Sequence, residues 1–218
     1  MLNREVFDVD PTGRRLPNDG VTALDAPSTQ QEWEVLQYEL EQFVAEGEYR
    51  EGLRRILTSY LANVDKGLQP ACWVSGFYGS GKSHFVRVLT YLWTNPVING
   101  VAARSLVRVP DDVAELLKEI DSLAARDRTV TFAAAGVMRR ASGSSVAQPL
   151  MEILLGAAGL PTAIGPARFV LWLKREEVWD RFVAALQAKG RTSEEVKSNL
   201  FVSPAIRQAL LDVMPGWE

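Results

Sequence analysis

Residues 71–83 read ACWVSGFYGSGKS, and this stretch decides the expected fold. Its first five residues are uncharged and mostly apolar, as in a strand buried within a sheet. The remaining eight residues hold three glycines and end in Lys82 and Ser83. Because glycine permits positive φ and lets the backbone approach an anion closely, this spacing predicts a loop that cradles phosphate.

The residues after this loop have a helical pattern. Apolar side chains recur at helical spacing before Asn95-Pro96, at Phe85, Val88, Leu89, Leu92 and Trp93. Strand, glycine-rich loop and helix follow one another as a phosphate-binding loop of the G-x-x-x-x-G-K-[ST] type requires. The loop amides and the helix N-terminus then face one concavity, where the helix dipole favours a bound anion.

The chemistry of this loop predicts ATP and Mg²⁺ as cofactors. Lys82 is expected at the β- and γ-phosphates, and the Ser83 hydroxyl suits Mg²⁺, which takes few protein oxygens. His84 is expected to pack or form a hydrogen bond rather than act as a catalyst, and no catalytic residue is predicted. The predicted cofactor-binding residues are Gly76, Tyr78, Gly79, Ser80, Gly81, Lys82, Ser83 and His84, with Ser83 as the metal ligand.

Composition excludes several other classes of protein. The 218 residues carry a net charge of −3 and contain one cysteine and one histidine, so disulfide frameworks and structural zinc sites are ruled out. Cys72, on the expected buried strand, is predicted to be an inert core thiol. No apolar run is long enough to span a membrane and no signal peptide opens the chain, so a soluble, cytoplasmic protein is expected.

Three regions are expected along the chain. Residues 1–67 are predicted to form an irregular arm (1–27) and a helical hairpin whose first helix starts at Thr29-x-x-Glu32, a capping-box spacing. Residues 68–140 are predicted to form the core, with a first strand, the loop, its helix and a second strand over 129–134. Residues 141–218 are expected to be helical, with one helix starting at Ser203-Pro204, and to continue into a longer protein.

The expected fold class is therefore α/β: the start of a P-loop NTPase. It would be rich in helices, with an amino-terminal helical layer and an incomplete parallel sheet. Trp33, Trp93 and Trp179 fall on apolar helix stripes and are expected in the core. Arg139-Arg140 is interpreted as a solvated loop pair, with contact to phosphate or nucleic acid as the alternative.

The acidic residue that a P-loop ATPase places at the end of a second core strand is missing from the expected position. The apolar run that starts at Phe132 ends in Gly136. Asp212 follows apolar residues, but Ile206, Leu210 and Val213 recur at helical spacing, so Asp212 is predicted to lie on a helix surface. The sequence predicts nucleotide binding and leaves hydrolysis open.

Residues 73–85, WVSGFYGSGKSHF, resemble the P-loop of the large ATPases of BREX phage-defence systems, of the BrxC/PglY type. Asp10-Pro11, Gly20-Val21, residues 36–40, Glu46-Gly47-Glu48-Tyr49 and residues 160–166 resemble the PglY branch. The resemblance implies the amino-terminal part of an ATPase of the broad AAA+ or origin-recognition-like class. Such an ATPase would act with a methyltransferase and a phosphatase-like partner to modify host DNA and block phage replication. It also implies association with DNA within that complex, and a homo-oligomer is a further expectation.

Two other functions remain open from the sequence. One is a small P-loop kinase or nucleotide-switched enzyme, which would need further buried strands. The other is a scaffold that binds nucleotide without turnover.

Overall fold

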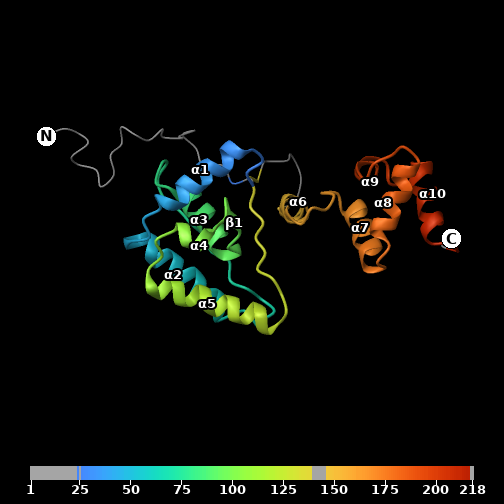
Figure 1. The fold of residues 1–218 in the computed structure, drawn as a ribbon. Helices are drawn as coiled ribbons and strands as arrows, with labels where there is room; N and C mark the ends of the chain where they lie inside the picture. The colour runs from blue at the N-terminus through green and yellow to red at the C-terminus, as the bar shows by residue number, and fades with distance from the viewer. Residues whose placement is uncertain (1–23, 25, 139–145, 217–218) are drawn as a thin grey trace. The chain divides into compact units, whose positions relative to one another are not determined.

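The computed structural model describes residues 24, 26–138 and 146–216, and the chain divides into two compact units after Ala133. Most of the expected irregular arm over 1–27 and the pair Arg139-Arg140 lie outside the described residues. The first unit consists, as far as it is described, of α1 (Gln30–Glu41), α2 (Gly47–Leu61), α3 (Lys82–Thr94), β1 (Val97–Ile98), β2 (Val101–Ala102), α4 (Ala103–Leu106) and α5 (Asp111–Arg126) (Figure 1).

Helix α1 begins at the predicted capping box. The Thr29 hydroxyl accepts a hydrogen bond from the backbone N–H of Glu32 at 3.2 Å, and the Glu32 carboxylate accepts one from the Thr29 N–H at 3.2 Å. Two helical turns on, Leu36 and Leu40 are fully buried. The cap and the apolar stripe together place this helix where the sequence predicts it.

Helices α2 and α5 lie side by side (Figure 1). Leu53 and Leu57 of α2 and Leu117 of α5 belong to one buried apolar cluster. At the rim of this contact, the Arg50 guanidinium donates to the Asp112 carboxylate at 3.2 Å. Because this ion pair is largely exposed, apolar burial dominates the stability of the contact.

Helix α3 buries Phe85, Val88 and Leu92 in the same cluster, together with one charged side chain, Arg87. The Arg87 guanidinium donates to the Glu39 carboxylate of α1 at 2.7 Å, and only 7% of the Arg87 side chain is exposed. A charge buried to this degree is tolerated only when it is paired. The pair therefore ties α3 to α1.

A short hairpin follows α3. β1 and β2 pair antiparallel, with Val97 opposite Ala102 and Ile98 opposite Val101. The turn residues Asn99 and Gly100 both have positive φ, 47° and 84°. This is the conformation that Asn-Gly favours in two-residue hairpins.

The second unit is helical in its described part, with α6 (Ala147–Ala157), α7 (Ile164–Arg175), α8 (Trp179–Ala188), α9 (Glu194–Asn199) and α10 (Pro204–Val213). Phe182 and Leu186 of α8 pack in a core with Leu210 of α10. Ser203 precedes α10 and Pro204 is its first residue, as predicted. Asp212 lies on α10, where it pairs with Lys189, so its assignment to a helix surface is confirmed.

The prediction of an α/β P-loop NTPase fold with a parallel sheet is wrong. Residues 71–75 and 129–134, the two expected strands, are irregular. The described residues contain one sheet, the antiparallel hairpin, and one isolated bridge between Val44 and Arg108. A strand exists only where a neighbouring strand pairs with its N–H and C=O groups, and apolar composition alone cannot supply that neighbour. The protein is mostly helical.

The expected burial of residues 71–75 is also wrong. All five residues are exposed, and the Trp73 side chain keeps 89% of its accessible surface. Cys72 is a free, exposed cysteine, so the prediction of a core thiol fails with the strand that would have buried it. Trp33 and Trp93, in contrast, pack against the first core, and Trp179 packs against the second.

Replacing Glu39 should destabilise the first unit, because Arg87 would remain buried without its carboxylate. We expect Glu39→Ala to lower the free energy of unfolding by about 3 kcal/mol in urea denaturation. Glu34 is an exposed carboxylate on the same helix, and Glu34→Ala should change it by less than about 0.5 kcal/mol. Equal effects of the two substitutions would contradict a structural role for the pair.

Candidate functional site

The loop over residues 76–83 enters α3 through two left-handed glycines. Gly79 has φ 78° and Gly81 has φ 77°, and Gly81 is the N-cap of α3. Side chains other than glycine are strained in this conformation. Gly76 does not have positive φ, but a Cβ there would lie 2.7 Å from the Ser80 Oγ, so a side chain at residue 76 would require the Ser80 hydroxyl to move.

The first turn of α3 is open toward the loop. The first backbone hydrogen bond of this turn runs from the Phe85 N–H to the Gly81 carbonyl at 2.8 Å, and no side chain caps the helix. The N–H groups of residues 82–84 therefore lack helical acceptors, as at any helix start. Together with the helix dipole, they form a place where an anion is favoured.

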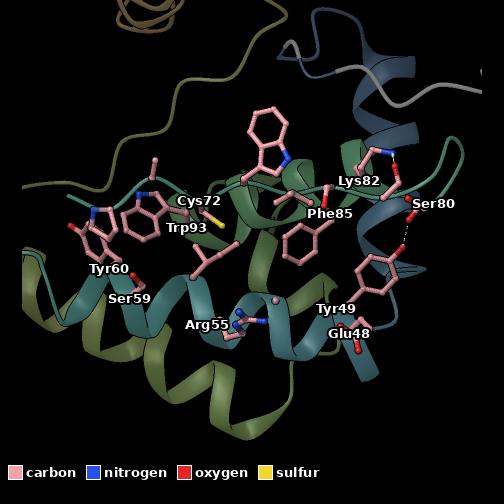
Figure 2. Close-up of a pocket in the computed structure, with 18 of the residues that line it drawn as sticks. Glu48, Tyr49, Arg55, Ser59, Tyr60, Cys72, Ser80, Lys82, Phe85 and Trp93 are labelled. Atoms are coloured by element: carbon pink, nitrogen blue, oxygen red, sulfur yellow. Dashed lines mark hydrogen bonds between the residues drawn. The ribbon is translucent and has the colours of Figure 1, made fainter. Parts of the chain in front are cut away.

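Lys82 folds back across the loop. Its Nζ donates to the Gly76 carbonyl at 2.9 Å and to the Phe77 carbonyl at 2.6 Å (Figure 2). These neutral acceptors hold the ammonium over the loop, and a phosphate would compete with them because hydrogen bonds between charged partners are stronger. The predicted function of Lys82 is compatible with this placement.

The other predicted site residues lie along the same loop. Ser83 is exposed in the first turn of α3, and the Tyr78 side chain is 99% exposed. The Ser80 N–H donates to the Phe77 carbonyl at 3.2 Å, which closes the turn. Since Mg²⁺ in nucleotide sites takes most of its oxygens from phosphate and water, the exposed position of Ser83 is compatible with its predicted role as a metal ligand.

His84 is a packing residue, as the sequence predicts. Its ring is half-buried, with its centroid 5.4 Å from that of Phe43. Burial lowers the pKa of His84 below its ordinary value, and the positive charge of Arg87 lowers it further. The side chain is therefore neutral at neutral pH, and it adds no cation to the loop.

Tyr49 contacts the loop from α2, and it is not among the site residues predicted from the sequence. Its hydroxyl donates to the Ser80 carbonyl at 2.9 Å (Figure 2). The Tyr49 ring lies between two others, 5.4 Å from Phe43 and 5.9 Å from Phe85 between centroids. A contact across 31 residues leaves no local pattern, so a periodicity argument could place Tyr49 only on a helix.

A groove of about 1220 Å³ runs between α2 and residues 69–77 and reaches the loop. Figure 2 shows Tyr60 and Trp93 at one end and Tyr49, Ser80 and Lys82 at the other. The apolar residues of the expected strand thus line an open groove and not a sheet interior. Glu48 is the one carboxylate among the described residues that line it.

No protein-family model and no solved structure matches the chain. None of the helices that the structure describes is long and apolar enough to cross a membrane.

Alanine substitutions at Gly79 and Gly81 should distinguish the cost of a left-handed backbone from the cost of a collision with Tyr49. Gly79 has open space around it, so Gly79→Ala should cost only the left-handed conformation, about 1–2 kcal/mol. At Gly81 a Cβ would also collide with the Tyr49 hydroxyl, whose ring is held by Phe43 and Phe85. We expect Gly81→Ala to cost at least about 1 kcal/mol more in urea denaturation. Equal costs would contradict the close approach of Tyr49.

His84 should titrate at lower pH in the folded protein than in the unfolded chain. Since it is the one histidine in the sequence, its ring protons give an unambiguous NMR signal. A lowered folded pKa means that the unfolded chain binds more protons, so stability falls as the pH drops through the unfolded pKa toward the folded one. The same signal in urea is the control, and a folded pKa at or above the unfolded one would contradict the burial of this ring.

Proposed function

We propose that the chain binds ATP with Mg²⁺ at residues 76–84. The observation that carries this proposal is the loop itself, in which Gly81 turns left-handed into an uncapped helix start. Lys82 already lies across the loop. Backbone amides, a helix N-terminus and a movable ammonium form the set of groups that binds a polyphosphate.

Each residue has a distinct role in this proposal. Lys82 would leave the Gly76 and Phe77 carbonyls and pair with the β- and γ-phosphates, while the loop amides surround the phosphate oxygens. The Ser83 hydroxyl would hold Mg²⁺, which neutralises phosphate charge when bound. Gly79 and Gly81 keep the backbone close to the phosphates because neither carries a Cβ.

Binding without turnover by this chain is the second candidate, and the distribution of carboxylates favours it. Hydrolysis by a P-loop ATPase uses an acidic side chain that holds Mg²⁺ beside the phosphates. Among the described residues that line the groove, Glu48 alone is acidic, and Asp212 is engaged with Lys189 in the other unit. A small P-loop kinase is disfavoured, because the buried strands that it would need are not found in the described chain.

The biological setting that we propose is BREX-type phage defence, and it rests on the sequence resemblance of residues 73–85 and of the amino-terminal stretches alone. In that setting the chain would be the ATP-binding amino-terminal part of a large cytoplasmic ATPase. Its partners would be a methyltransferase and a phosphatase-like protein, with DNA bound by the complex and a homo-oligomer as a further expectation.

Calorimetric titration with MgATP tests the proposed site. Lys82→Ala should weaken binding roughly tenfold to a hundredfold, because it removes hydrogen bonds from a charged donor. Lys118→Ala changes an exposed lysine on α5 and should leave the affinity unchanged.

Phosphate release, measured in the same samples, tests for turnover. Negligible release is expected both for the amino-terminal part of a larger ATPase and for a scaffold, whereas steady release that Lys82→Ala abolishes would contradict both. Absence of MgATP binding to the unchanged protein would contradict both.

A further inference from the structure

We propose that Tyr49 is the positioning residue of the phosphate loop, and that it acts through one hydrogen bond from outside the loop. This inference rests on the proposed nucleotide site and assigns a role to a residue 31 positions away from its partner. The contact is the hydroxyl of Tyr49 on the Ser80 carbonyl, at 2.9 Å.

The geometry of the peptide unit links this contact to the bound anion. In a trans peptide the C=O of one residue and the N–H of the next point in opposite directions. Because Tyr49 holds the Ser80 carbonyl toward α2, the Gly81 N–H of the same peptide unit points away from α2. The Tyr49 hydroxyl thus fixes the orientation of the Gly81 N–H, which is one of the backbone donors of the loop.

The aromatic packing makes Tyr49 a fixed support. Its ring lies between Phe43 and Phe85, at 5.4 and 5.9 Å between centroids. Gly52, one helical turn further along α2, allows this packing, since a Cβ there would lie 3.1 Å from the Phe85 Cζ. The hydroxyl therefore cannot move without disturbing the packing of α2 against the start of α3.

Gly81 belongs to the same arrangement. Any side chain at this position would collide with the Tyr49 hydroxyl. The second glycine of the motif is thus required both by its left-handed φ and by the approach of Tyr49. Sequence reasoning accounts for the first requirement alone.

The test uses Tyr49→Phe, which removes the hydroxyl and keeps the ring. Tyr60→Phe is the matched control, because Tyr60 lies on the same helix and lines the same groove, and its described contact is a ring contact with Trp93. Affinities for MgATP and for Mg-tripolyphosphate are measured by calorimetric titration, and stability by thermal denaturation.

We expect Tyr49→Phe to lower the affinities for MgATP and for Mg-tripolyphosphate by the same factor, roughly fivefold, with little change in melting temperature. The equal factor follows because the hydroxyl acts on the phosphate loop and not on the nucleoside. Tyr60→Phe should leave both affinities unchanged. Unchanged affinities in Tyr49→Phe would overturn the proposal. A lower affinity for MgATP with an unchanged affinity for Mg-tripolyphosphate would also overturn it, because Tyr49 would then act on the nucleoside.

Hydrogen exchange in the protein without nucleotide separates this proposal from the proposed function. Tyr49→Phe should speed exchange of the Ser80 and Phe85 amides, whose hydrogen bonds close the loop. If the unchanged protein bound no nucleotide, the proposed function would fail. Unchanged exchange would then overturn the positioning role as well, and faster exchange would support it.

Discussion

The candidate site depends on the packing of α2 against the beginning of α3. Tyr49 and Phe85 lie nearly parallel, at 25° and 5.9 Å, and Gly52 lets the Phe85 ring approach the α2 backbone. This contact fixes the position of Gly81, and therefore the residue at which the left-handed loop becomes a helix.

In the usual arrangement, a buried strand fixes the beginning of a phosphate-binding loop and a helix fixes its end. Here residues 71–75 are irregular and exposed, so no strand supports the beginning of the loop. The Tyr49 hydrogen bond to Ser80 provides a side support from α2. The Lys82 ammonium, bound to the Gly76 and Phe77 carbonyls, draws the beginning of the loop toward α3.

The sequence predicted local features and failed on distant ones. The cap at Thr29 and Glu32 and the start of α10 at Ser203-Pro204 each depend on neighbours within a few residues, and the structure contains both. The sheet depended on pairing between segments far apart in the chain, and apolar composition was a poor guide to it. Residues 71–75 are apolar and yet line an open groove. Tyr49 was missed for the same reason, since its partner lies 31 residues away.

Nucleotide binding and hydrolysis differ in the same way, because binding depends mainly on groups close together in the chain and hydrolysis depends on distant ones as well. Binding requires groups that one short segment and its neighbouring helix can provide, namely loop amides, the start of α3 and Lys82. Hydrolysis in P-loop ATPases also uses an acidic residue that holds Mg²⁺ beside the phosphates, carried by a second strand of the same sheet. Residues 129–134 do not pair with residues 71–75. An acidic residue following this segment would have no sheet to hold it at a defined position relative to the loop.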